Sequence, residues 1–71
     1  MKDAQLLGLG HTIRQFRERE GLSQEDLAFR AGLHRTYVGQ LESGDRNPSF
    51  LVLIRLARAL QIPVSKLFPD D

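Results

Sequence analysis

SQEDLAFRAGLHRTYVGQLE, residues 23–42, has the pattern of two short helices separated by a glycine turn. Ser23 is a good N-cap residue, and the acidic residues Glu25 and Asp26 follow in the first turn, where the helix dipole favours negative charge. Gly32 provides the left-handed stop that ends the first helix, which we place at about 24–31. A second helix follows at about 34–42.

The break between these two helices is only one or two residues long, which is too short for an antiparallel hairpin. The second helix must therefore turn sharply across the first, which is the helix-turn-helix geometry. Leu27, Ala28 and Ala31 form the expected buried side of the first helix. Val38 and Leu41 form the inward side of the second. The helix-turn-helix geometry is common in DNA-binding proteins. A helical hairpin that does not bind DNA shares part of this pattern, so that alternative stays open.

The preceding segment predicts a scaffold helix. Leu9, Ile13 and Phe16 recur at i, i+4 and i+7, which indicates an amphipathic helix over about 5–20. Gly21 then supplies a left-handed stop. This helix would hold the 23–42 unit from the amino-terminal side.

Two further helices follow the turn-rich loop SGDRNP. The fourth helix has Ser49 as its cap, and its apolar surface is broader than one small core needs. The fifth is short, begins at Pro63 and ends at Pro69. The sequence therefore predicts an all-α, compact five-helix bundle in which residues 1–71 form one domain.

Composition limits the classes of function. The chain has 71 residues and no cysteine, so its stability must come from helix packing, and thiolate metal sites are excluded. His11 and His34 do not stand at metal-ligand spacing, and we expect no metal or cofactor. No apolar run is long enough for a signal peptide or a membrane span, so we expect a cytoplasmic protein with no membrane partner.

The charge distribution is more informative than the net charge of +1. The arginines between residues 30 and 58 are Arg30, Arg35, Arg46, Arg55 and Arg58. Only Glu42 and Asp45 oppose them in that segment. A basic face on a near-neutral protein is an electrostatic footprint for nucleic acid, although an ordinary mixed surface fits the same composition.

Four segments resemble the Xre/Cro/phage-repressor helix-turn-helix family: LGHTIRQFR, GLSQEDLAFRAGL, YVGQLESGDRNPS and LIRLARALQIP. Within that family, HRTYVGQLESGDRN is similar to the controller proteins of restriction–modification systems. The resemblance implies a lambda-repressor-like fold that binds double-stranded operator DNA, usually as a homodimer. It implies a transcriptional regulator rather than an enzyme.

The resemblance also implies roles for individual residues. Arg35, Thr36 and Gln40 match the family's base-reading positions, and these side chains suit guanine, the thymine methyl and adenine respectively. The positions expected to contact the DNA backbone are Gln24, His34, Tyr37, Ser43, Arg46 and Asn47. Arg17 and Glu42 match a structural ion pair between the first and third helices.

Several of these assignments have plainer alternatives. Tyr37 could instead lie at the edge of the core. Gln24 could be an ordinary exposed polar residue, and Arg46 could be a solvated charge in a loop. His34 stands at a cap position where the family favours Ser, Thr or Asp, so we expect it to meet a phosphate or base, or to have no role. Gly39 costs a helix about 1 kcal/mol relative to alanine. Either close approach of DNA or local packing would account for it.

The apolar excess of the last two helices predicts a self-complementary surface. Its expected residues are Ile54, Ile62, Val64, Leu67 and Phe68. A two-fold dimer would place two copies of the 34–42 helix about 34 Å apart, which predicts a near-palindromic operator. The alternative is that these residues only close the core of the monomer.

Two other function classes compete with DNA regulation. An antitoxin-like or other protein-interaction module would use the same fold, but a partner groove favours apolar anchors where this chain has a polar, arginine-bearing stripe. An enzyme would need paired carboxylates or a nucleophile with its base, and the sequence shows neither. The sequence leaves open any contact with RNA polymerase.

Overall fold

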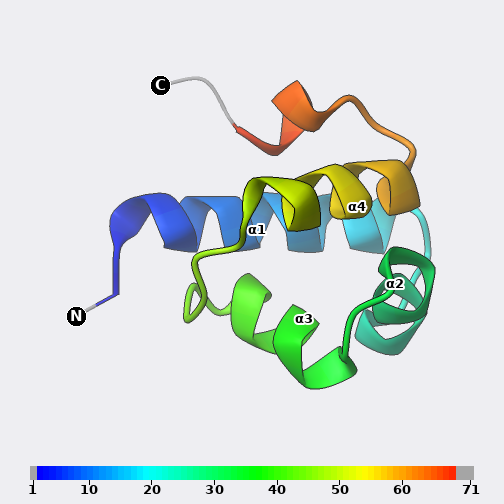
Figure 1. Ribbon diagram of the computed structural model, residues 1–71, viewed down its shortest axis with the longest axis horizontal. Coiled ribbons are helices and arrows are strands. Elements are labelled where there is room, and N and C mark those ends of the chain that lie inside the picture. Colours follow the sequence, from blue (N-terminus) through cyan, green and yellow to red (C-terminus); the bar gives the residue numbers. More distant parts are fainter. Residues whose placement is uncertain (1, 69–71) are drawn as a thin grey trace.

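The computed structural model describes residues 2–68, which form four α-helices and one 3₁₀ turn. The elements are α1 (Ala4–Arg19), α2 (Gln24–Ala31), α3 (Arg35–Glu42), α4 (Phe50–Leu60) and η1 (Val64–Leu67). In Figure 1, α1 and α4 cross the middle of the view, with α2 and α3 below them and η1 above. The predicted compact, all-helical class is confirmed. None of the helices in this part of the chain is long and apolar enough to cross a bilayer.

The predicted fifth α-helix is wrong, because this segment is a single 3₁₀ turn. The backbone N–H of Lys66 donates to the carbonyl of Pro63 at 3.0 Å, which is an i→i+3 bond. Forming the first α-helical turn fixes several residues for one hydrogen bond, and four residues are too few to recover that cost. The tighter closure is typical of such short segments. The predicted end at Pro69 lies outside the described residues.

The helix ends follow short-range capping signals. Ser23 and Asp26 form a capping box, in which the Ser23 hydroxyl accepts from the Asp26 N–H at 3.0 Å and the Asp26 carboxylate accepts from the Ser23 N–H at 2.9 Å. These hydrogen bonds lower the pKa of Asp26. Asp3 caps α1, so that helix starts and ends one residue before the predicted bounds. The α3 helix begins at Arg35, one residue later than predicted.

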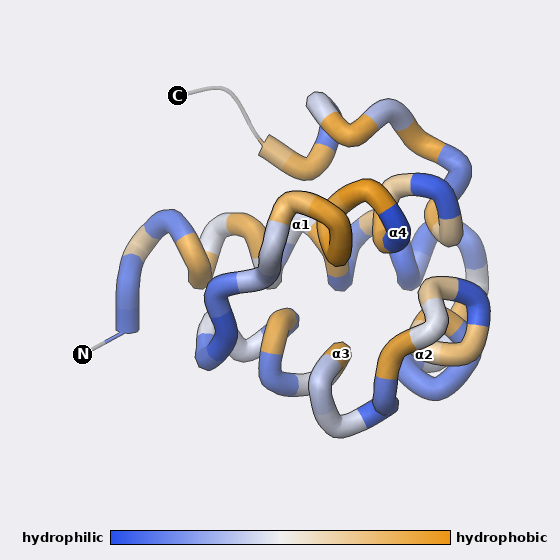
Figure 2. Tube along the Cα trace, viewed as in Figure 1, coloured by the Kyte–Doolittle hydropathy of each residue, from blue (hydrophilic) through white to orange (hydrophobic). Residues whose placement is uncertain are grey.

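The core draws its fully buried side chains from every element. They are Ile13, Leu27, Val38, Leu41, Leu56, Leu60 and Leu67. Figure 2 shows that α4 is apolar over most of its length, as the sequence predicted. Leu67 is 0 % exposed, so η1 is fastened to the bundle by this side chain. Its assignment to a dimer surface was therefore wrong, because the monomer already covers it.

At Gly10 the α1 backbone lies directly against the end of α3. A Cβ atom at this position would lie 2.7 Å from the backbone oxygen of Glu42 and closer still to that of Leu41. Both oxygens belong to the last turn of α3, so they cannot rotate away as a flexible side chain would. Gly8, two residues earlier on the same helix, has nothing within 4 Å of the equivalent Cβ position.

These two glycines should respond oppositely to the same substitution. We expect Gly10→Ala to lower the free energy of unfolding by about 1–3 kcal/mol, because α1 must move away from α3. Gly8→Ala, the matched control, should raise it by up to about 1 kcal/mol, because alanine is the better helix former. Urea denaturation of both variants measures the difference, and changes of the same sign would contradict the close approach at Gly10.

Candidate nucleic-acid interface

The α3 helix presents an outer face that the fold leaves uncovered. Val38 and Leu41 are 0 % and 1 % exposed, and they fix the inner face of α3 against the core. The helix packs against α2 and α1 and lies at the lower edge of the molecule in Figure 1. The exposed or half-buried residues of the outer face are Arg35, Thr36, Gly39, Gln40 and Ser43. A rigid helix with a polar outer face is therefore available to a ligand.

A buried ion pair ties α1 to the end of α3. The Arg17 guanidinium donates to both carboxylate oxygens of Glu42, at 2.6 and 3.0 Å, and to the backbone oxygen of Leu22 at 2.8 Å. The Arg17 and Glu42 side chains are only 11 % and 4 % exposed. The hydrogen bond to Glu42 raises the pKa of Arg17. Arg17 and Glu42 thus form the structural pair that the sequence suggested.

Gln24, a predicted phosphate contact, joins the same network. Its Nε2 atom donates to Glu42 Oε1 at 3.1 Å. A carboxamide nitrogen carries two hydrogens, so the second remains for a ligand. A Cβ atom on Gly39 would lie 3.5 Å from Gln24 Oε1, which is an ordinary van der Waals distance. Local packing therefore does not require glycine at position 39.

Tyr37, Gln40 and Arg46 form one cluster at the carboxyl end of α3. Arg46 Nε donates to Gln40 Oε1 at 2.9 Å, and its guanidinium carbon lies 5.8 Å from the centre of the Tyr37 ring. The backbone N–H of Asp45 donates to the Gln40 carbonyl at 2.8 Å. Gly44, with φ of 78°, makes this reversal of the chain possible. The structure thus brings three separately predicted contacts together.

Lys2 is a residue of this region that sequence reasoning missed. Its Nζ atom donates to the backbone oxygen of Ser43 at 2.7 Å and lies 3.2 Å from Asp45 Oδ1. A cation here complements the negative end of the α3 dipole. Lys2 and Ser43 are separated by 41 residues in the chain, so no local sequence pattern reveals their contact.

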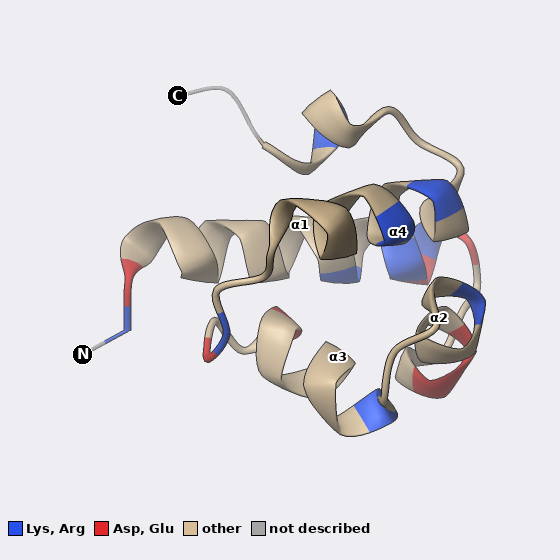
Figure 3. Ribbon diagram, viewed as in Figure 1, with Lys and Arg blue, Asp and Glu red and all other residues tan. Residues whose placement is uncertain are grey.

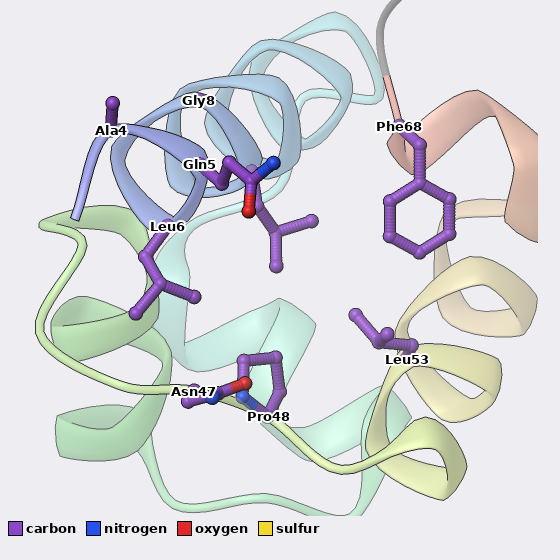
Figure 4. Close-up of a pocket in the computed structure, with 9 residues that line it drawn as sticks. Ala4, Gln5, Leu6, Gly8, Asn47, Pro48, Leu53 and Phe68 are labelled. Carbon is purple, nitrogen blue, oxygen red and sulfur yellow. The ribbon is translucent and has the colours of Figure 1, made fainter.

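His34 and Asn47 occupy different surroundings. His34 is the exposed N-cap residue of α3 and its side chain makes no capping hydrogen bond, which fits the expectation that it is a poor cap. Asn47 is exposed and lines an apolar hollow of about 500 Å³. Figure 4 shows this hollow between the start of α1, the loop at Pro48 and the side chains of Leu53 and Phe68.

The arginines between residues 30 and 58 do not form a single basic face. Arg55 and Arg58 lie on α4, which packs on α2, η1 and α1. Arg35 and Arg46 lie at α3 and the loop after it. Figure 3 shows basic residues spread over several helices. The mixed-surface alternative fits this distribution, and the charge relevant to α3 is local.

The remaining predicted dimer residues are only partly available. Ile62 and Val64 are half-buried and pack against the core. Ile54 is half-buried and Phe68 is 51 % exposed.

The structure adds two residues to this surface, Phe50 and Leu51, which are 69 % and 68 % exposed at the start of α4. We call the residues Phe50, Leu51, Ile54 and Phe68 the α4 patch. The sequence pattern placed neither Phe50 nor Leu51 on the dimer surface.

Comparison with known proteins places the fold in a family. Residues 13–67 match a family model described as helix-turn-helix. The chain belongs to this helix-turn-helix family. Control protein C.SmaI from Serratia marcescens is 48 % identical over 59 residues, which cover 83 % of this chain and 70 % of that protein. The predicted resemblance to the family and to controller proteins is confirmed.

Two restriction-modification controller proteins of known structure share the observed architecture. The restriction-modification controller protein C.AhdI from Aeromonas hydrophila has a TM-score of 0.92 and 47 % identity, covering 93 % of this chain and 100 % of that one. The controller protein C.Esp1396I, solved as a tetramer with its natural 35 base-pair operator, has a TM-score of 0.82 and 29 % identity. That comparison covers 87 % of this chain and 82 % of the other.

The ion pair generates a prediction about stability. We expect Glu42→Gln to lower the free energy of unfolding by about 3–5 kcal/mol, because the largely buried charge of Arg17 loses its partner. Glu18→Gln is the matched control, since Glu18 pairs with Arg14 at 3.4 Å on the surface. Loss of this surface ion pair should lower the free energy of unfolding by less than about 1 kcal/mol. Thermal and urea unfolding compare the two, and equal effects would contradict a structural role for Glu42.

Proposed function

We propose that this protein is a sequence-specific regulator of transcription that binds double-stranded DNA with α3 in the major groove. The observation that carries the proposal is the division of α3 into two faces. Val38 and Leu41 lock one face into the core, while Arg35, Thr36 and Gln40 project from the other. The family membership and the operator complex of C.Esp1396I support it.

The residues of the outer face divide into two roles. Arg35 and Thr36 carry base recognition, because guanidinium groups bond bidentately to guanine and the threonine methyl suits thymine. Gln40 joins them at the next turn of the helix. The residues that position α3 on the sugar-phosphate backbone are Gln24, His34, Tyr37, Ser43, Arg46 and Asn47. Backbone contacts set the register of the protein and base contacts specify the sequence.

The active form in this proposal is a homodimer joined through the α4 patch. Its four residues present apolar surface that the core does not cover. A two-fold axis through this patch would set two α3 helices about one turn of DNA apart. The operator would then be near-palindromic. The similarity to C.SmaI and C.AhdI supports control of restriction–modification genes as the setting.

Selection from a random duplex library tests DNA recognition. We expect a near-palindromic sequence to be enriched, with an affinity that falls steeply as salt rises, because phosphate contacts release counterions. Arg35→Ala should relax base preference at one position in each half-site. Arg30→Ala removes an equal charge from α2 and should leave the preference unchanged. Enrichment of no sequence, even at low salt, would overturn the proposal.

Sedimentation tests the dimer. The wild-type protein should sediment as a dimer at tens of micromolar, and Leu51→Glu should shift it to monomer by placing a charge within the α4 patch. Phe29→Glu is the matched control, since Phe29 is 86 % exposed on α2 and lies outside the patch. It should leave the dimer intact. Dimers that survive Leu51→Glu would place the interface elsewhere.

A further inference from the structure

The carbonyl oxygen of Gln40 already has a partner within the protein. Arg46 Nε lies 2.9 Å from Gln40 Oε1. Arginine has donors and no acceptor, so the oxygen end of the carboxamide must face Arg46 and the Nε2 end must face away. The orientation of Gln40 is therefore set before any ligand arrives.

This contact is one of several that join α3 to the loop that follows it, and we call this group of contacts the junction. The guanidinium carbon of Arg46 lies 5.8 Å from the centre of the Tyr37 ring, which is within the range of a cation–π contact. The Asp45 N–H donates to the Gln40 backbone oxygen at 2.8 Å, so the loop backbone is anchored at the same residue. Lys2 pairs with Asp45 at 3.2 Å, which keeps that carboxylate occupied beside Arg46. Arg46 itself contacts Gln40 and Tyr37, and the loop that carries it is anchored through the neighbouring residue Asp45.

The junction changes what Gln40 offers to a base. A glutamine that reads adenine accepts from the adenine N6 amino group through Oε1 and donates to N7 through Nε2. Here the Arg46 guanidinium takes one of the two acceptor positions of Oε1, and its positive charge lies close to the other. The N6 amino group of an adenine at this position would approach the N–H groups of Arg46, and two sets of hydrogen-bond donors repel each other. Guanine places its O6 acceptor at that position, with the N7 acceptor beside it.

We propose that Gln40 and Arg46 act as one mainly donating unit that selects guanine, and rejects adenine, at the base pair facing Gln40. This inference rests on the proposed function and deepens it. It replaces the expected pairing of Gln40 with adenine. It also makes Arg46 a specificity-determining residue in addition to a contact to the DNA backbone.

Library selection with single variants tests the unit. The facing base pair is the one at which Gln40→Ala loses its preference. Wild-type protein should select guanine there by roughly 5- to 100-fold over adenine, the range of one good bidentate contact. Arg46→Ala should remove the positive charge beside Gln40 Oε1 and switch the preference at that pair alone towards adenine.

Arg19→Ala is the matched control. Arg19 is also an exposed arginine over an aromatic ring, with its guanidinium carbon 5.2 Å from the centre of Phe16 on α1. Arg19→Ala should weaken DNA binding at most slightly and leave guanine preferred at the base pair facing Gln40. If Arg46→Ala weakens all sequences alike and guanine stays preferred, Arg46 contacts only the backbone and the inference is overturned.

The free protein provides a readout that does not depend on DNA. The side-chain amide resonances of Gln40 and the Nε–H resonance of Arg46 report the hydrogen bond by NMR. Arg46→Ala should shift the Gln40 amide signals, and Arg19→Ala should not. Unchanged Gln40 signals would overturn the inference. Selection of adenine by the wild type would overturn it while leaving the proposed function intact, whereas selection of no sequence would overturn both.

Discussion

The pairing of Arg17 with Glu42 is the constraint on which the arrangement of the helices depends. A charge removed from water must find full pairing, so α1 and α3 have to be placed where Arg17 and Glu42 can meet. Arg17 uses three donors for this purpose, and Glu42 also accepts from Gln24. No buried side-chain nitrogen or oxygen within residues 2–68 lacks a partner. The network therefore fixes α1, α2 and α3 as a unit.

The close approach at Gly10 and the ion pair support one another. Glycine lets the α1 backbone lie directly against the last carbonyls of α3. That proximity in turn brings Arg17 within reach of Glu42. A small chain without cysteine needs such contacts, because its core alone supplies little stability. The result is a helix, α3, whose polar outer face is presented by a rigid support.

Local signals predicted most of the fold. Ser23, Gly32 and Ser49 marked helix ends correctly, because capping depends on atoms only a few residues apart. The segment after Pro63 was misassigned as an α-helix, since apolar spacing over four residues cannot distinguish α from 3₁₀ geometry. For the same reason Leu67, which is buried in the core, was assigned to the dimer surface together with the exposed Phe68.

The sequence by itself determined the helical class, the helix-turn-helix unit and the family, because helix periodicity, caps and turn glycines are short-range and strong. The tertiary structure alone decided how the candidate interface is built. Lys2 at the end of α3, Gln24 on Glu42 and Arg46 on Gln40 all join different elements of the fold. Such contacts depend on how the helices pack, and packing distances are not encoded in any local pattern.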